Sequence, residues 1–300
     1  MSSTRTVGKV AVPIVAALAV GAVAVAGLSA NSSSKDGAKQ PPAHQKSLAN
    51  AAVAPSDPGN PATWHLPVEA YMVSKADARL VGVSRDQVID VCMERAGFPQ
   101  WTPAPDLPAL GGKTETDWRY GIHDAALAAK RGYHPDAAEQ IAYDKAMMAG
   151  AVDKSGADPK AEESCALSAS GTVPAVVASD LVQKIKADSF KESVKEPQVV
   201  AAFAQWSSCM KAKGYSYSKP MDAGDDPRFN DPYTVTDLEI ATAKADIACR
   251  TQNHVEKTWF DAESALQTKA IKANQSALAF VKTANEETVA KAKSFATARR

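Results

Sequence analysis

From about residue 64 to the C-terminus, apolar residues recur mainly at steps of three and four, the spacing of one helix face. Asp158-Pro159 and Pro197 suit helix starts, because aspartate caps free amide groups and proline is tolerated in the first turn. Gly97 and Gly214 suit helix ends. No window alternates apolar and polar residues for long enough to indicate a strand. The pattern predicts an all-α fold.

Other boundary signals predict further helices between these points. Ser84–Gln87 has the form of a capping box ahead of a helix that ends near Gly97. Pro135 suits the first turn of a helix that continues to Gly150. Ser179–Glu196 predicts a short amphipathic helix.

The last segment, Thr234–Arg300, contains neither glycine nor proline. A capping box at Thr236–Glu239 opens it, and apolar or small residues then alternate at steps of three and four from Leu238 to Leu266. This heptad-like seam predicts a long C-terminal helix with a coiled-coil-like face that packs closely against another helix. A second box at Thr283–Glu286 is typical of a helix restart, so the sequence leaves the continuity of this helix open.

The N-terminus differs from the rest in charge and hydropathy. Met1–Lys9 carries basic residues and no acidic one, and Val10–Leu28 carries no charge. This order is typical of an export signal. As a helix the apolar run would reach about 28 Å, close to the thickness of a bilayer core, so a cleaved signal peptide and an uncleaved membrane anchor within residues 1–30 both fit. Because positive charge stays on the cytoplasmic side, the rest of the chain is expected outside the membrane.

Residues 31–63 are rich in Ser, Pro, Ala, Gln and Lys and show no apolar periodicity. We expect them to form a disordered tether, with the folded part beginning near Trp64. Two helical repeat units then follow, residues 64–175 with an insert and residues 176–300 with the long C-terminal helix.

An internal repeat involves all four cysteines. Cys92–Phe98 matches Cys209–Tyr215 as Cys-Met-x-x-x-Gly-aromatic, and Lys160–Cys165 matches Lys244–Cys249 as Lys-Ala-acid-x-small-Cys. Two matched pairs in the same order indicate a duplicated unit. Among the connectivities that four cysteines allow, the repeat favours one bridge in each unit. The predicted disulfides are Cys92 to Cys165 and Cys209 to Cys249.

Disulfides need an oxidising compartment, which agrees with export. The competing interpretations are a metal site and free thiols, but zinc sites favour ligand pairs such as Cys-x-x-Cys, which the chain lacks. We expect neither a metal nor a cofactor.

Aromatic residues, among them Trp101 and Tyr217, follow the glycine of each repeat. They could form a platform that binds a sugar or a peptide, or they could pack over the end of the helix as an apolar cap. We favour the cap.

These motifs look like those of a family of uncharacterised exported proteins of actinomycetes. Besides the two cysteine repeats, the similar segments are Trp64–Tyr71, Arg119–Asp124, Gly132–Pro135, Trp206–Met210 and Ala245–Cys249. The resemblance spans about Trp64 to Phe280 and implies export and a cell-envelope location, with no known activity. Many members look like lipoproteins, which carry a lipid on a cysteine directly after the apolar run. This chain has no cysteine at that place, so the resemblance leaves open how the protein is anchored.

Charge and composition narrow the partners. Lys plus Arg and Asp plus Glu each total 34, so the chain lacks the long-range field that gathers nucleic acid, and we expect no nucleic-acid partner. Aromatic residues make up only 6% of the chain, so its core must be mainly aliphatic.

Polar and aromatic groups concentrate between residues 118 and 135, where a ligand site is expected first. The candidate ligand-binding residues are Trp118, Arg119, Tyr120, His123, Asp124, Tyr133 and His134. The alternative, which we favour, is that these side chains join the long insert to the core. On a continuous helix the two histidines would lie about 16 Å apart, too far to share a metal unless Gly132 turns the chain back.

Other motifs carry weaker signals. Ser216–Lys219 has the Ser-x-x-Lys form of penicillin-interacting acyltransferases, but Pro220 follows at once and no Lys-Thr-Gly is present. The aspartates between Asp222 and Asp231 lack the spacing of a calcium loop. We therefore expect no catalytic residues and a structural or binding role outside the membrane, with peptidoglycan or an envelope membrane complex as the partner. The alternative is a hydrolase or transferase that acts on the cell wall.

Overall fold

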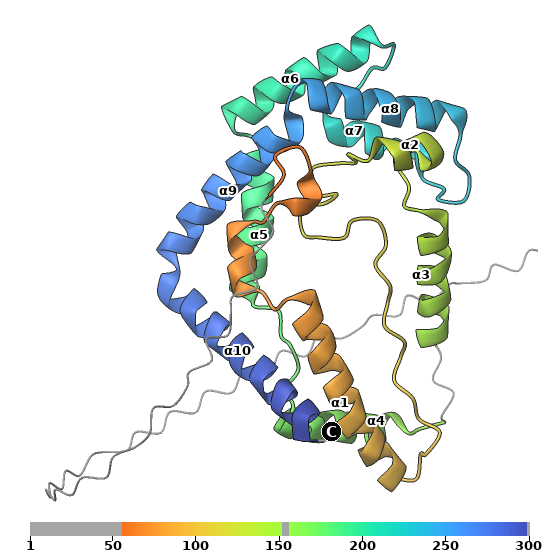
Figure 1. The fold of residues 1–300 in the computed structure, drawn as a ribbon, viewed down its shortest axis with the longest axis vertical. Helices are drawn as coiled ribbons and strands as arrows, with labels where there is room; N and C mark the ends of the chain where they lie inside the picture. The colour runs from red at the N-terminus through yellow and green to blue at the C-terminus, as the bar shows by residue number, and fades with distance from the viewer. Residues whose placement is uncertain (1–55, 152–155, 299–300) are drawn as a thin grey trace, which may run out of the picture. The chain divides into compact units, whose positions relative to one another are not determined.

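The computed structural model describes residues 56–151 and 156–298, and every regular element in these ranges is helical (Figure 1). The all-α expectation is therefore confirmed. The predicted export segment and most of the predicted tether lie outside the described residues. Within the described ranges, no helix combines the length and the apolar character that a membrane crossing requires.

Two short 3-10 helices, η1 (Pro61–Thr63) and η2 (Pro67–Tyr71), open the described chain. Each starts with proline, whose fixed φ suits a first turn. Trp64 lies between them and is buried, and its indole nitrogen donates a hydrogen bond to the carbonyl of Asp57 at 2.7 Å. Hydrogen-bonded structure thus includes Asp57, several residues before the expected boundary.

Helix α1 (Lys75–Arg95) begins earlier than the sequence predicted. Its N-cap is Ser74, whose hydroxyl accepts a hydrogen bond from the amide of Asp77 at 3.0 Å. The capping box predicted at Ser84 is wrong, because Ser84 lies in the middle of α1 and is buried. Burial of this face lets the helix run through a sequence that also suits a helix start.

The cysteine repeat corresponds to a helix-ending motif that occurs twice. After α1, Gly97 adopts a φ of 95°, and the amide of Phe98 donates to the carbonyl of Met93 at 2.9 Å. After helix α6 (Pro197–Ala212), the amide of Tyr215 donates to the carbonyl of Met210 at 3.0 Å in the same way. Both methionines are fully buried. The repeat therefore encodes a Schellman end, with glycine in the left-handed turn and an apolar pair across it.

Helix α4 (Pro159–Thr172), capped by Asp158 as predicted, packs against α1. The C-terminal helix α10 (Gln275–Ala298) also packs against α1 (Figure 1). A small core of Val81, Val173 and Ala292 fills the space among these segments. The first and last parts of the described chain are thus in direct contact.

Most large apolar side chains lie in a second core built from α6, helix α5 (Asp180–Ser193) and helix α9 (Val255–Ala273). Pro197 opens α6 as predicted, and α5 lies within the predicted amphipathic stretch, with Ser179 as its N-cap. Trp259 is fully buried and lies 5.1 Å, centroid to centroid, from both Phe190 and Phe203. A few aromatic rings thus occupy much of the core in a chain that is poor in aromatics.

Helices α2 (Ala125–Arg131) and α3 (Ala137–Gly150) form the long insert. Asp124 caps α2, which packs against helix α8 (Asp237–Gln252). Asp136 caps α3, so Pro135 precedes the helix and does not lie in its first turn as predicted. The short α7 (Pro220–Gly224) and η3 (Pro227–Phe229) connect α6 to α8.

Thr236 caps α8 as predicted, but the expected seam does not describe the buried face of this helix. Leu238, Ala241 and Ala248 of the seam are exposed, and polar residues are buried in their place. The buried residues of α8 are Glu239, Thr242, Ala243, Asp246, Ile247, Cys249 and Arg250. The seam holds in α9, where Val255, Trp259 and Ala262 are buried.

The segment after Thr234 forms three successive helices, α8, α9 and α10, of which α10 is the longest. His254 separates the first two with a φ of 49°, and the side chain of Asn253 caps α8 by donating to the carbonyl of Cys249 at 2.8 Å. Asn274 separates α9 from α10, and its side chain donates to the carbonyl of Ala270 at 2.8 Å. The restart expected at Thr283 is wrong, since α10 runs through it.

Both predicted disulfides are present and join helices. Cys92–Cys165 links α1 to α4, and Cys209–Cys249 links α6 to α8. The Cα atoms of the two pairs are 5.6 and 5.7 Å apart, within the usual range for a disulfide. The pairing selected by the sequence repeat is confirmed.

Candidate functional site

Arg119 and Tyr120, from the predicted polar and aromatic stretch, converge on the carboxylate of Glu263 in α9. Arg119 donates from Nε and Nη2 at 2.8 and 2.6 Å, and the Tyr120 hydroxyl donates at 2.8 Å. The Glu263 side chain is fully buried, and only 14% of the Arg119 side chain is exposed. Such a two-pronged guanidinium–carboxylate pair is among the stronger polar contacts in proteins.

Two more donors complete the surroundings of Glu263. Ser189 on α5 donates at 3.3 Å, and Gln267, one turn further along α9, donates at 2.9 Å. Burial opposes the charge of Arg119, but the hydrogen bond and negative charge of Glu263 raise the pKa of Arg119 above its ordinary value. Burial, aided by Glu263, raises the pKa of the Tyr120 hydroxyl well above its usual range. Arg119 therefore stays charged and Tyr120 stays protonated.

A second buried ion pair lies on α8. Asp246 accepts hydrogen bonds from Arg250 at 2.6 Å and from the Trp206 indole at 2.8 Å, and the Tyr133 hydroxyl donates to it at 3.3 Å. The Arg250 guanidinium also donates to backbone carbonyls, including that of Tyr120. Burial opposes the charge of Arg250, yet Asp246 raises its pKa, and burial with the charge of Asp246 raises the pKa of Tyr133. This pair ties the candidate stretch to α6 and α8.

The two histidines face different carboxylates. His123 Nε2 lies 2.6 Å from Asp117 Oδ1, and His134 Nε2 lies 3.4 Å from Glu239 Oε1 on α8. The same Glu239 oxygen accepts a hydrogen bond from the amide of Tyr133 at 2.9 Å. The contact between His134 and Glu239 Oε1 has the distance of an ion pair but not the alignment of a hydrogen bond. Within the described part of the chain, His134 Nε2 has no hydrogen-bond partner, and neither has the other carboxylate oxygen, Glu239 Oε2.

Gly132 allows the chain to turn so closely over Glu239. It ends α2 with a φ of 58°, a conformation that side chains with a Cβ rarely adopt. A Cβ at this position would overlap the Glu239 carboxylate. The turn separates the two histidines onto different partners, and no group of three or more His, Cys, Asp or Glu side chains in the described ranges is placed to hold a metal.

The candidate residues other than Asp124 are therefore at least half-buried, and they do not converge on one site. Arg119 and Tyr120 meet at one carboxylate, while Tyr133, His123 and His134 each face a different one. Trp118 is half-buried and packs against a small core around Ile122 and Ile247. Asp124 is exposed and accepts hydrogen bonds from the first amides of α2.

Sequence reasoning missed the acidic partners of this stretch, Glu239, Asp246 and Glu263. All three are fully buried and lie in the segment that has no glycine or proline. A signal was present, because Glu239, Asp246 and Arg250 recur at steps of seven and four and so share one helix face. Apolar and small residues alone indicate a different face of this helix.

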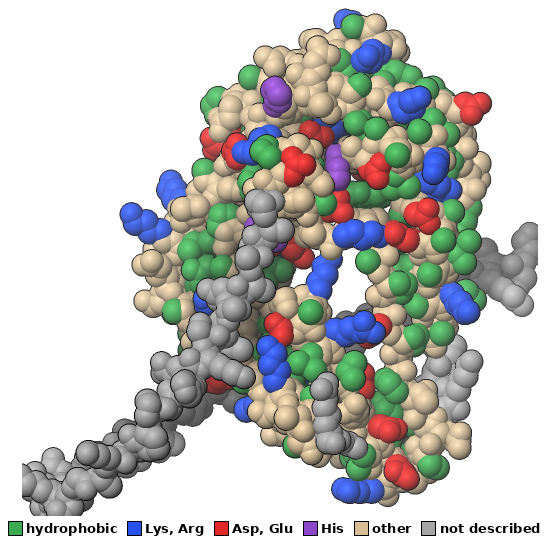
Figure 2. All heavy atoms as spheres, viewed as in Figure 1, with side chains coloured by type: hydrophobic (Ala, Val, Ile, Leu, Met, Phe, Trp, Pro, Cys, Tyr) green, Lys and Arg blue, Asp and Glu red, His purple; other side chains and the backbone are tan. Residues whose placement is uncertain are grey.

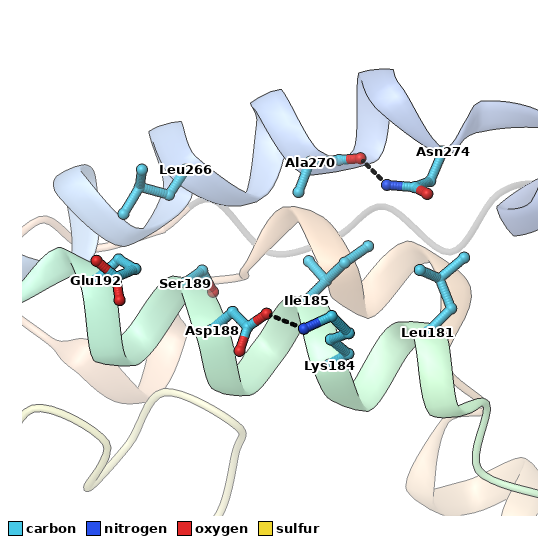
Figure 3. Close-up of a pocket in the computed structure, with 9 residues that line it drawn as sticks. All are labelled: Leu181, Lys184, Ile185, Asp188, Ser189, Glu192, Leu266, Ala270 and Asn274. Carbon is cyan, nitrogen blue, oxygen red and sulfur yellow. Dashed lines mark hydrogen bonds and ion pairs between the residues drawn. The ribbon is translucent and has the colours of Figure 1, made fainter.

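A groove between α5 and α9 lies beside the Glu263 cluster (Figure 3). Leu181 and Ile185 on α5 lie opposite Leu266 and Ala270 on α9, and Ser189 lies at the floor of the groove. The enclosed volume is about 300 Å³. Polar residues stand at the rim, including Lys184 and Asp188, which pair with each other at 2.6 Å.

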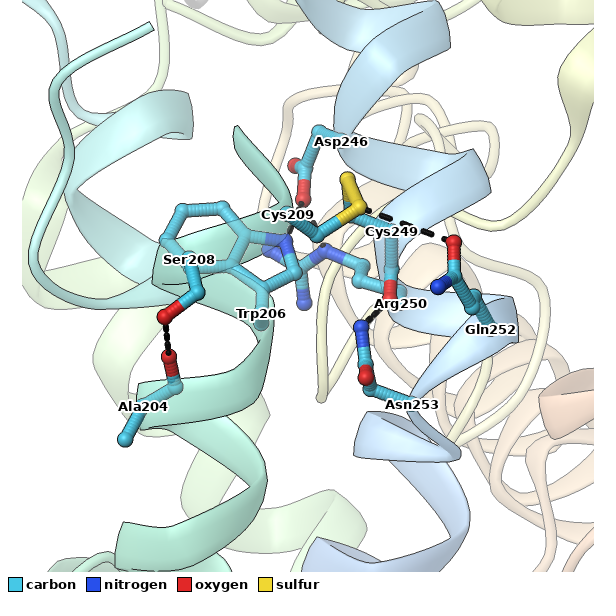
Figure 4. The surroundings of a disulfide bond; sticks show 9 residues. All are labelled: Ala204, Trp206, Ser208, Cys209, Asp246, Cys249, Arg250, Gln252 and Asn253. Carbon is cyan, nitrogen blue, oxygen red and sulfur yellow. Dashed lines mark hydrogen bonds and ion pairs between the residues drawn. A yellow bond between two sulfur atoms is a disulfide. The ribbon is translucent and has the colours of Figure 1, made fainter. Parts of the chain in front are cut away.

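The Cys209–Cys249 disulfide has one sulfur near solvent and one in the core. Cys249 is fully buried, whereas Cys209 lines a surface depression of about 510 Å³ with amide and hydroxyl side chains (Figure 4). Gln252 and Asn253 are the closest amides on α8. The neighbouring Trp206 and Asp246 place this disulfide next to the second buried ion pair.

On the face shown in Figure 2, Lys and Arg side chains lie among Asp and Glu side chains, with apolar side chains between them. Comparison of the chain with family models, with curated proteins and with solved structures finds no match in any of the three. The resemblance to exported actinomycete proteins therefore stays a prediction from the sequence motifs. The two disulfides are consistent with an oxidising environment.

Proposed function

We propose that the protein is exported and acts outside the cytoplasmic membrane as a non-catalytic binding module of the cell envelope. The observation that carries this proposal is the internal use of the polar and aromatic stretch at residues 118–134. Its arginine, tyrosines and histidines face carboxylates of the same chain, mostly in the interior. Acid–base or nucleophilic chemistry needs ionisable groups that reach a substrate, and these groups reach one another.

Export is supported by two features that do not depend on each other. The basic start and the uncharged apolar run that follows it have the order of an export signal. The two helix-joining disulfides would be reduced in most cytosols and persist in an oxidising compartment.

The partner that we propose is peptidoglycan or a membrane complex of the envelope. Two disulfides and two buried ion pairs restrict the motion of the helices, so a surface formed by them loses little conformational freedom on binding. A pre-ordered surface of this kind suits a protein that holds a partner in place.

The test uses the full chain with both disulfides intact. Two assays measure binding: cosedimentation with purified peptidoglycan and crosslinking in intact cells. In at least one of them, the oxidised chain is expected to bind more than a reduced and alkylated control. Labelled peptidoglycan should release no soluble fragments. Equal behaviour of the oxidised and reduced chains in both assays, or release of fragments, would overturn the proposal. Fusion of residues 1–63 to a reporter that is active only outside the cytoplasm tests export separately.

A further inference from the structure

A cavity of about 590 Å³ lies apart from the clusters and the groove described above. It is enclosed by α1, α4, the C-terminal end of α3 and the segment Trp101–Pro105. Most of its wall is apolar, formed by Ile89, Ala166 and the two prolines of that segment. Small-molecule sites in proteins have this size and this mainly apolar character.

The charged group in the wall is the carboxylate of Glu162 on α4. Trp101 donates a hydrogen bond from its indole nitrogen to Glu162 Oε1 at 2.9 Å, which fixes the ring beside the carboxylate. Within the described residues, no other side chain bonds or pairs with Glu162, and no lysine or arginine lines the cavity. The cavity therefore holds a negative charge that the surrounding wall does not neutralise.

Two further carboxylates lie near this cavity. Asp86 is one turn before Ile89 on α1, and Asp106 follows directly on Pro105. Burial, together with the nearby charge of Asp106, raises the pKa of Asp86. Arg79 pairs with Asp106 at 3.1 Å on the exposed side, where solvent screens the interaction, and Arg85 donates to backbone carbonyls that include that of Ala166 in the cavity wall, so in the described part of the chain neither arginine pairs with Glu162.

We propose that this cavity binds an organic ammonium ion, with its charged head over the face of the Trp101 ring and beside the Glu162 carboxylate. The face of an indole ring attracts a cation, and the attraction grows where water is excluded. The alkyl part of the ligand packs against Ile89 and the prolines. A sugar fits less well, because the described wall offers few polar side chains besides Thr102 and Glu162, and most sugar hydroxyls would lose their hydrogen bonds.

Titration calorimetry on the oxidised full chain tests the site with choline and pentylammonium as probes. The control ligand is 3,3-dimethylbutan-1-ol, which has the shape of choline without the charge. At least one ammonium probe is expected to bind saturably and about tenfold or more tightly than the neutral alcohol. Binding of neither probe below about 10 mM, or equal binding of the alcohol, would overturn the proposal.

The matched variants are Glu162→Gln, which keeps an oxygen for the Trp101 indole, and Glu163→Gln, which removes a charge from the adjacent exposed position of α4. Glu162→Gln should weaken ammonium binding about tenfold, and Glu163→Gln should change it less than twofold. Equal losses in the two variants would contradict the site. Should Glu162→Gln unfold in circular dichroism, Trp101→Leu supplies the test, since it removes the ring and should abolish the preference for the ammonium over the alcohol. The site does not depend on the macromolecular partner proposed above, so either proposal can fail without the other.

Discussion

Glu263 is the most connected charged group in the interior, and its replacement by glutamine gives the sharpest test of the fold. Five donor contacts from four side chains reach its two oxygens at 2.6 to 3.3 Å. Glutamine has nearly the same shape but only one acceptor oxygen. Because donors approach both oxygens of Glu263, the amide NH2 of glutamine would face a donor in either orientation.

The size of the effect follows from the charge that is left behind. Removal of one partner from a buried ion pair costs about 3–5 kcal/mol, because the other charge stays buried without compensation. Arg119 would be that charge, with 14% of its side chain exposed. We expect Glu263→Gln to lower the free energy of unfolding by about 3–5 kcal/mol, a factor of about a hundred or more in the ratio of folded to unfolded protein.

Urea denaturation followed by circular dichroism measures this change. The matched control is Asp261→Asn on the same helix, which removes an exposed carboxylate that pairs with Lys257 at 2.6 Å. The control should lose less than about 0.5 kcal/mol. A loss below about 1 kcal/mol in Glu263→Gln, or a similar loss in the control, would refute the claim that this cluster holds α9 in place. A double-mutant cycle with Arg119→Met would then measure the coupling directly.

Three further predictions concern pH, backbone and redox state. Burial raises the pKa of Glu256 above its ordinary value of 4.5. The stability of the wild-type protein should therefore fall as the pH rises from about that value through the raised pKa, and Glu256→Gln should remove this slope in urea titrations at several pH values. Gly132→Ala should lower the free energy of unfolding, measured by urea denaturation, by about 2–4 kcal/mol, because Gly132 has a φ of 58° and a Cβ there would overlap Glu239. The control Gly171→Ala should be neutral or slightly stabilising, because a Cβ at Gly171 meets nothing within 4 Å. Equal effects of the two substitutions would contradict this. The two disulfides should be reduced at similar rates, as mass spectrometry of alkylated samples would show, because each joins a half-buried cysteine to a buried one; reduction of one bridge long before the other would contradict this expectation.

Local chemistry was enough to predict many helix boundaries. Asp158, Pro197 and Thr236 start helices where their capping or first-turn preferences indicate, because these effects depend on neighbours in sequence. The box at Ser84 failed, since the same residue types occur inside a helix when tertiary packing buries them.

The partners of the buried charges could not be predicted from local pattern. Tyr133 and Asp246 are 113 residues apart, and Tyr120 and Glu263 are 143 apart, so nothing near either residue indicates its partner. A periodicity analysis places charged side chains toward solvent, and it therefore assigned the wrong face to α8. The disulfides were an exception, because the repeated motif linked distant cysteines in the sequence itself.

The division of the C-terminal segment at Asn274 has a consequence for how the protein opens. On one side of this break, α10 packs with α1 around Val81, Val173 and Ala292, and the Cys92–Cys165 bridge joins α1 to α4. On the other side, α9 packs with α5 and α6, and the aromatic core there includes Cys249 of the second bridge. Leu278, near the start of α10, is fully buried with Val182 and Ile185 of α5, so only the part of α10 beyond this contact can open separately from α9. Amides of α1 and of the C-terminal part of α10 are then expected to exchange together, through openings that leave the amides of α9 protected.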